Sequence, residues 1–462
     1  MKALHDPDRL LGEGLARIRD EFTIPAGFPP EVLEAARRAA AQAPGAEHVD
    51  RTDRSFVTLD PAASTDLDQA FAIEPAGADW LLHYAIADVA WFVREGDPLD
   101  TEAWKRGTTT YLPDDKASLY PPALCEGAAS LLPDVDRPAV ILTTRIDPQG
   151  EASLDGVERA LVRSRAKLAY ETVRDADLPE GFAQIAQRVG AAEQRRGAAR
   201  VDPPEQVLEA DGSGGFTLSF RPMLVSEVRN AALSLAANLA VAQAMLAART
   251  GLFRVMPPPD PKADGRLRAS ARALRLDWPA NVPLDAFERA LDPSSPPQAA
   301  FMMAIRRAGN GASYKPFDPA EPPWHAAIAA PYAHATAPLR RLADRYVLRA
   351  VLALANGDPV AAEVEEAFSR LPKVMARAAS RDGRIERAVI DLAETVMLAG
   401  QEGSVFTATV TDLQGDTARL QFQDMPVIAG IHAPGAFPGE SLQVRLTQAD
   451  PARRTLAFEP FA

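Results

Sequence analysis

Cysteine is almost absent from this sequence, since Cys125 is the only one among 462 residues. A single thiol cannot form an internal disulfide, and it cannot supply the thiolates of a structural zinc site. We therefore expect a fold that is held together by its apolar core in a reducing compartment, which indicates the cytoplasm. The length is sufficient for about three domains.

Histidine and positive charge are also scarce. The six histidines show no paired spacing typical of a zinc site, so any bound metal is expected to have carboxylate ligands. Acidic residues outnumber basic residues by 63 to 50, which gives a formal net charge of −13. Such a surface disfavours nonspecific binding of polyanions, so a nucleic-acid site would have to be a local basic tract or channel.

A long uninterrupted hydrophobic run is lacking as well. The longest apolar region, residues 231–248, is rich in alanine and is interrupted by Ser234, Asn238 and Gln243. Alanine contributes little to membrane insertion, so this region is expected to be a buried helix and not a membrane span. We expect no membrane partner.

The pattern of apolar residues changes along the chain. Within residues 1–50, two short helices are expected, either as a helix-turn-helix-like module or as a lead-in packed on the main domain. Short strands dominate from about residue 53, and helices dominate after residue 226. The expected helices of this second half are 226–249, 297–309, 337–356, 359–371 and 374–398. Strands followed by helices indicate an α+β fold class.

The last 60 or so residues have a third pattern. Five short alternating strands are expected between residues 404 and 459, separated by Gly, Asp and Pro. This is the size of a small OB-type barrel, which often binds oligonucleotides, although the pattern fits other small barrels equally well.

The stretch of residues 60–69 carries the clearest sign of chemistry. Asp60, Asp66 and Asp68 lie between two strand-like runs with no Lys or Arg among them. Clustered carboxylates repel one another, so bringing them together is costly unless a cation binds. Magnesium prefers such oxygen ligands and keeps positions open for phosphate. The alternative is a solvated acidic loop or an Asp-Pro turn.

Several motifs resemble those of the ribonuclease II and ribonuclease R family. Residues 58–68 resemble its acidic motif, and further motifs follow in the family's order: AIADV at 85–89, YLP at 111–113, SRAKLAY at 164–170 and PYAHATAPLRR at 331–341. The resemblance implies an RNB-type catalytic domain over residues 51–400 and an OB-fold RNA-binding domain over 401–462. Members commonly carry two cold-shock-type OB domains before the catalytic domain, whereas about 50 helical residues precede it here.

The resemblance implies a processive 3′→5′ exoribonuclease that hydrolyses single-stranded RNA to nucleoside 5′-monophosphates. It assigns metal binding to Asp60, Asp66 and Asp68, with magnesium as the cofactor and manganese as a possible substitute. Two divalent ions about 4 Å apart can activate water and stabilise both the pentavalent phosphorus and the leaving oxyanion. Asp68 takes the position most critical for catalysis, and Asp66 and Arg340 share the catalytic assignment.

Gln69 departs from the family pattern, which usually has an aspartate at this fourth metal position. A glutamine carbonyl can coordinate a cation, but it supplies no negative charge. We therefore expect one metal site to be weakened. The alternative function is an RNA-binding protein of the same fold with weakened or lost catalysis.

The resemblance also assigns RNA contacts. Arg340 matches the arginine at the scissile phosphate, and Arg341 is either structural or a neighbouring phosphate contact. The other assigned residues are an aromatic clamp, two contacts to the terminal nucleotide and a glutamate near the RNA path: Tyr111, Tyr170, Glu227 and Glu386. Single-stranded RNA is the expected partner. No obligatory protein partner is evident, and a monomer is expected.

Overall fold

In the computed structural model, the described residues are 2–4, 9–198, 205–210, 215–221, 223–258, 261–292, 295–309 and 311–461. Their largest sheet has six strands in the order β2-β9-β3-β4-β5-β8. The strands are β2 (Val49–Asp50), β3 (Phe56–Asp60), β4 (Gln69–Ala76), β5 (Asp79–Ala87), β8 (Asp136–Ile146) and β9 (Ala152–Ala169).

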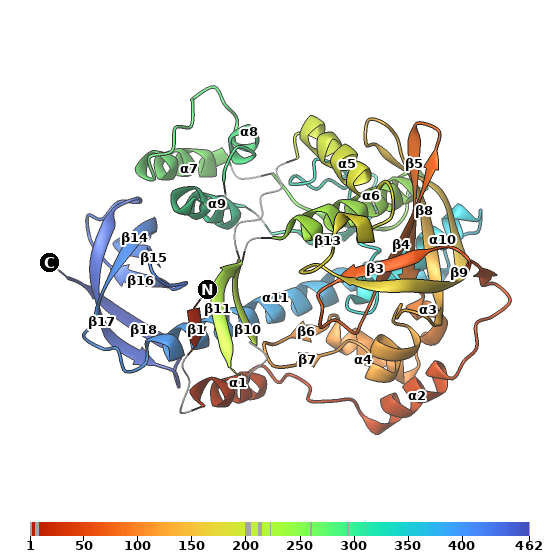
Figure 1. The fold of residues 1–462 in the computed structure, drawn as a ribbon, viewed down its shortest axis with the longest axis horizontal. Helices are drawn as coiled ribbons and strands as arrows, with labels where there is room; N and C mark the ends of the chain where they lie inside the picture. Colours follow the sequence, from red (N-terminus) through yellow and green to blue (C-terminus); the bar gives the residue numbers. More distant parts are fainter. Residues whose placement is uncertain are drawn as a thin grey trace.

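The long strand β9 joins the two ends of this sheet. Its first part pairs antiparallel with β8, and its last part pairs parallel with β3. Strand β5 is buried along most of its length, because it has a neighbouring strand on each side and helices pack on the sheet. Helices α6 (Val225–Ala247) and α10 (Leu342–Ala355) contact β9, and α5 (Phe182–Arg196) packs on α6 (Figure 1).

Helix α6 contains the apolar region that the sequence predicts to be a buried helix. It is long and apolar enough to cross a membrane by length and composition alone, but 67% of its most apolar window is buried inside the protein. A core helix of this kind passes the same test as a membrane span, so the burial favours a structural role in the core.

The second half of the chain is helical, as predicted, with one correction. Residues 362–398 form a single helix, α11 (Ala362–Leu398), instead of the two predicted helices at 359–371 and 374–398. Pro372 lies inside α11, where its missing N–H would normally interrupt a helix. The buried face continues across the proline through Leu371 and Met375, so packing holds the two parts in one helix.

Shorter elements complete the part of the chain that precedes the five C-terminal strands. Trp278, Phe287 and Phe301 pack together in a small separate core formed by α7, α8 and α9. The remaining elements of this part are α3 (Val89–Phe92), α4 (Pro98–Arg106), β6 (Thr110–Tyr111), β7 (Lys116–Ala117), a π-helix (Ala123–Ala128), a 3₁₀-helix (Asp175–Asp177), β10 (Glu205–Ala210), β11 (Phe216–Arg221), β12 (Leu252–Val255), α7 (Pro261–Ala273), α8 (Leu284–Glu288), α9 (Pro296–Ala308) and β13 (Ser313–Pro316).

The two N-terminal helices pack on different parts of the protein. Helix α1 (Leu10–Glu21) packs against α11, whereas α2 (Pro30–Ala40) packs against α4 and the π-helix. Ahead of them, β1 (Lys2–Leu4) pairs antiparallel with β11. This packing favours the lead-in interpretation over a helix-turn-helix module.

The C-terminal region forms the predicted five strands. The sheet order is β16-β15-β14-β17-β18, and the edge strands β16 and β18 contact each other, so the sheet curls into a nearly closed barrel at one end of the molecule (Figure 1). Phe406, Phe422 and Phe458 pack together in its core. The strands are β14 (Val405–Gln414), β15 (Thr417–Phe422), β16 (Ile428–His432), β17 (Ser441–Asp450) and β18 (Thr455–Pro460).

A buried carboxyl group joins the barrel to the rest of the protein. Glu394, near the end of α11, accepts hydrogen bonds from Gln206 Nε2 at 2.6 Å and from the backbone N–H of Ile428 at 2.8 Å. Burial raises the pKa of Glu394 to about 8. The folded protein therefore holds a proton on this group that the unfolded chain releases at much lower pH.

We predict that Glu394→Gln makes folding less sensitive to pH. Between about pH 5 and about pH 8 the unfolded chain loses the Glu394 proton while the folded protein keeps it, so the folded wild type loses stability as pH rises. The variant keeps a carbonyl acceptor and does not titrate. Near pH 8 its free energy of unfolding should therefore exceed that of the wild type by at least ~1 kcal/mol. Urea unfolding of both proteins across this range measures the difference. Parallel pH profiles would contradict the prediction.

Candidate active site

The acidic stretch forms the link between two paired strands of the main sheet. Strand β3 ends at Asp60, and β4 begins at Gln69. The link is held from outside by Ser130, whose Oγ donates to the Thr65 carbonyl at 2.7 Å and accepts from the Leu67 N–H at 2.9 Å. These bonds fix the backbone between the three aspartates.

Asp68 is bound by a segment that lies far away in the sequence. Its side chain is 4% exposed, its Oδ1 accepts from the Leu339 N–H at 2.7 Å, and its Oδ2 lies 3.2 Å from Arg340 Nε. Burial raises the pKa of Asp68 to about 7, although Arg340 and the Leu339 hydrogen bond oppose the shift. The buried carboxyl group thus depends on these contacts to stay ionised.

The neighbouring arginines have different environments. The backbone around them is anchored, since Thr109 N–H donates to the Arg340 carbonyl and Leu342 N–H donates to the Gly107 carbonyl. The Arg340 side chain is 45% exposed, which leaves part of its guanidinium available to a ligand. Arg341 instead pairs with the fully buried Asp344, at 2.7 Å. Arg340 faces the acidic site, whereas Arg341 has a structural partner.

Asp60 has a buried carboxylate oxygen that lacks a hydrogen-bond partner among the described residues. Its Oδ2 is buried and accepts no hydrogen bond. Burial raises the pKa of Asp60 to about 6, an effect that Arg340 opposes and Asp66 reinforces. Leaving such an oxygen bare is costly, and a bound cation would remove that cost.

The predicted metal ligands do not all converge on one point. Within the part of the chain that the structure describes, no three His, Cys, Asp or Glu side chains are grouped closely enough to hold an ion. The bare, buried Oδ2 of Asp60 fits a divalent cation, and Asp68 is the second buried carboxylate of the site. Asp66 and Gln69 both have other partners.

Asp66 contacts the hairpin formed by β6 and β7. Lys116 Nζ lies 2.8 Å from Asp66 Oδ1, and the Tyr111 hydroxyl donates to Asp66 Oδ2 at 3.3 Å. Lys116 also lies 3.0 Å from Glu126. Burial alone would lower the pKa of Lys116, but the hydrogen bonds to Asp66 and Glu126 outweigh it and hold the pKa above its ordinary value. Sequence reasoning missed Lys116, which lies outside the acidic stretch.

Gln69 is held by two hydroxyl groups. Its Oε1 accepts hydrogen bonds from Tyr84 and, at 3.0 Å, from Ser234 on α6. The two hydroxyls also lie within 2.7 Å of each other. Tyr84 is fully buried, so its hydroxyl needs an internal acceptor, and the Gln69 carbonyl provides it.

The two predicted terminal-nucleotide contacts, Tyr170 and Glu227, have different partners in the structure. Tyr170 follows β9 and donates its N–H to the Asp60 carbonyl at 3.1 Å, which places it beside the acidic loop. Its hydroxyl accepts from Asn230 Nδ2 at 2.7 Å, and burial raises its pKa to about 12. Glu227 instead pairs with Arg221 and accepts from the Leu224 N–H. Asn230 is a contact that sequence reasoning missed, and only the helical position relative to Glu227 could have indicated it.

The other predicted residues lie at the surface. Tyr111 is 53% exposed, which leaves its ring open for stacking. Glu386 lies exposed on α11.

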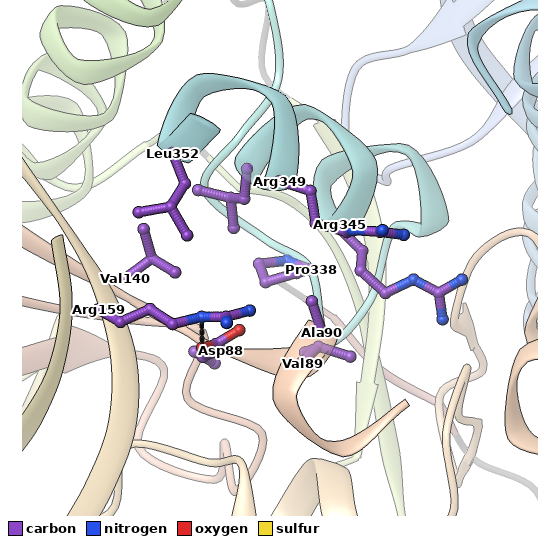
Figure 2. A pocket seen from close by; sticks show the side chains of 11 residues that line it. Asp88, Val89, Ala90, Val140, Arg159, Pro338, Arg345, Arg349 and Leu352 are labelled. Atoms are coloured by element: carbon purple, nitrogen blue, oxygen red, sulfur yellow. Dashed lines mark ion pairs between the residues drawn. The ribbon is translucent and has the colours of Figure 1, made fainter. Parts of the chain in front are cut away.

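Asp88, one of the residues in the AIADV motif, has structural partners. Its Oδ2 lies 2.8 Å from Arg159 Nε, and its Oδ1 accepts from the Trp91 N–H at the start of α3. This ion pair borders a cavity of about 10 Å³ that Pro338 also lines (Figure 2). The volume is about that of one water molecule. Asp88 thus lines the same small cavity as Pro338, which lies two residues before Arg340.

The fold and this site define the class of protein. The RNB domain family matches residues 48–357, and the RNase II-type exonuclease C-terminal S1 domain matches residues 404–461. The chain belongs to the RNB family and carries an S1 domain after the RNB domain, which confirms the resemblance seen in the sequence.

The individual relatives have low sequence identity to this chain. Ribonuclease R of Thermotoga maritima is 26% identical over 428 residues, which are 86% of this chain and 60% of the relative. The structure of Mycoplasma genitalium RNase R in complex with ribose-methylated single-stranded RNA has a TM-score of 0.87 at 19% identity, covering 100% of this chain and 79% of the other. The structure of yeast Ssd1, described as a pseudonuclease, has a TM-score of 0.65 at 15% identity, covering 98% of this chain and 58% of the other. The chain spans about half to two thirds of the length of its curated relatives.

We predict that the two adjacent arginines contribute differently to the stability of the protein. Arg341→Ala should lower the free energy of unfolding by about 3 kcal/mol, because it leaves the buried Asp344 without its partner. Arg340→Ala should cost about 1 kcal/mol or less, because the guanidinium is half-exposed and Asp68 can take up a proton. Urea unfolding at pH 6 measures both, and equal losses would contradict the distinct roles.

Proposed function

We propose that this protein is a divalent-metal-dependent 3′→5′ exoribonuclease. It would hydrolyse single-stranded RNA processively to nucleoside 5′-monophosphates, with magnesium as the ion and manganese as a substitute. One observation carries the proposal: the buried Asp68 pairs with the half-exposed Arg340, whose charge also acts on Asp60, the carboxylate with a bare buried oxygen. This arrangement unites a cation site with a phosphate-binding group. Action as a cytoplasmic monomer is part of the proposal.

Each residue would have a distinct task. Asp60 and Asp68 would hold the ion, which when bound supplies Lewis-acid activation of water and neutralises phosphate charge. Arg340 would bind the scissile phosphate, since its forked donors match a phosphate group whose charge grows in the transition state. The Leu339 N–H keeps Asp68 in position for both tasks.

Two aromatic residues support a single-stranded RNA substrate. The exposed ring of Tyr111 would stack on a base, which gives grip without sequence preference. Tyr170, held by Asn230 beside Asp60, would contact the terminal nucleotide, where the 2′-hydroxyl distinguishes RNA from DNA.

The alternative function is RNA binding with weakened or lost catalysis. Gln69 favours it, because this position contributes no charge and its carbonyl is held by Tyr84 and Ser234. The fold is also similar to that of yeast Ssd1, which is described as a pseudonuclease. The retained aspartates and Arg340 favour catalysis.

We predict a ladder of 3′-shortened products when 5′-labelled single-stranded RNA is incubated with the protein and magnesium. Asp68→Asn should slow shortening at least ~100-fold, because an isosteric amide removes the charge at the centre of the site. Denaturing gels measure the rate. Asp53→Asn, an exposed acid just before β3, is the matched control and should retain the wild-type rate.

The same assay decides between the two functions. Tight RNA binding by the wild type without shortening, in both magnesium and manganese, would support the RNA-binding alternative. Shortening that Asp68→Asn leaves unchanged would place the chemistry elsewhere. Single-stranded DNA and a duplex with a 3′ overhang, run in parallel, test the discrimination between sugars and the passage into duplex regions.

A further inference from the structure

A lysine lies inside the acidic site. The Lys116 ammonium is 2.8 Å from Asp66 Oδ1 and 3.0 Å from Glu126 Oε1, and its side chain is only 21% exposed. The acidic loop itself contains no basic residue. Lys116 therefore brings a fixed positive charge to a cluster of carboxylates from a separate hairpin.

The hairpin geometry directs this charge at Asp66. Strands β6 and β7 pair with Tyr111 opposite Lys116. The Tyr111 hydroxyl donates to one oxygen of Asp66 and Lys116 donates to the other. Asp66 thus has an ammonium and a hydroxyl on its own carboxylate, whereas Asp68 has one backbone donor and the half-exposed Arg340, and Oδ2 of Asp60 has no donor.

Gln69 is also committed within the protein. Its Oε1 faces two hydroxyl donors, Tyr84 and Ser234, and a carbonyl oxygen has two lone pairs. The Nε2 group of an amide cannot bind a cation. The fourth position of the acidic stretch therefore supplies neither a charge nor a free oxygen to a metal.

The two features change the charge of the site in the same direction, because a lost carboxylate and a gained ammonium each make it more positive by one. The three aspartates and Glu126, together with Lys116 and Arg340, carry a net charge of −2, which one divalent ion converts to 0. With aspartate at position 69 and no lysine, the net charge would be −4, and two divalent ions would be needed to reach the same 0. A phosphate substrate would then meet the same net charge in either arrangement.

We propose that Lys116 replaces the charge of a second metal ion, so that this site holds a single divalent ion at Asp60 and Asp68. Gln69, fixed by Tyr84 and Ser234, closes the position that a fourth carboxylate would provide. Lys116 is thus a charge-compensating residue beside Asp66. The inference rests on the proposed function, because it assumes that the site binds a divalent ion at all.

Counting bound Mn²⁺ by electron paramagnetic resonance tests the inference without an activity assay. Free Mn²⁺ is measured while the full-length protein is titrated without RNA. The wild type should bind one ion per chain, and Lys116→Met combined with Gln69→Asp should bind two. Lys116→Arg keeps the charge and should still bind one. Lys105→Met, at an exposed lysine paired with Glu102, is the matched control and should also bind one.

Several outcomes would overturn the inference. Two ions bound by the wild type would do so while leaving the exoribonuclease proposal intact, provided that the RNA ladder is still seen. One ion bound by the folded double variant, with its fold checked by circular dichroism, would show that Lys116 and Gln69 do not control the number of ions. No Mn²⁺ bound by the wild type, together with no RNA shortening, would instead remove the proposed function itself.

Discussion

The contact between Asp68 and the segment of Leu339 and Arg340 is the constraint on which the site depends. A buried carboxylate is unstable as an ion unless hydrogen bonds and a nearby cation replace its water. Here one backbone N–H and one guanidinium do so, and they come from a segment 271 residues further along the chain. The strands fix Asp68, α10 fixes the arginine segment, and the active site exists only where the two meet.

The same segment shows how packing gives two identical side chains different roles. Arg340 and Arg341 are adjacent, and sequence alone cannot say which faces the substrate. Backbone bonds to Gly107 and Thr109 fix the orientation of the segment, and the buried Asp344 holds Arg341. Arg340 is left pointing at Asp68 with half of its side chain exposed. The arginine that is left facing Asp68 is therefore determined by the partner of its neighbour.

Local patterns in the sequence predicted much of the fold, because strands, turns and helices follow periodicity. The acidic link between β3 and β4, the helix-rich second half and the five C-terminal strands follow from such patterns. Two features do not. The continuity of α11 through Pro372 depends on packing at Leu371 and Met375, and the contact of Asn230 with Tyr170 depends on how α6 lies beside β9. Both are properties of the assembled core.

Lys116 shows the same limit at the active site, and it also changes how Gln69 is interpreted. From sequence, Gln69 indicates only a lost carboxylate and therefore a weakened site. In the structure, the lost negative charge and the positive charge of Lys116 together make the site more positive by two, which is the charge of one divalent ion. No local motif connects the two residues, because Lys116 reaches Asp66 through the β6–β7 hairpin. Electrostatic stabilisation of a phosphate depends on net charge and placement, and a fixed ammonium can supply both. A departure from a family motif therefore indicates lost chemistry only after the surrounding charges have been counted in three dimensions.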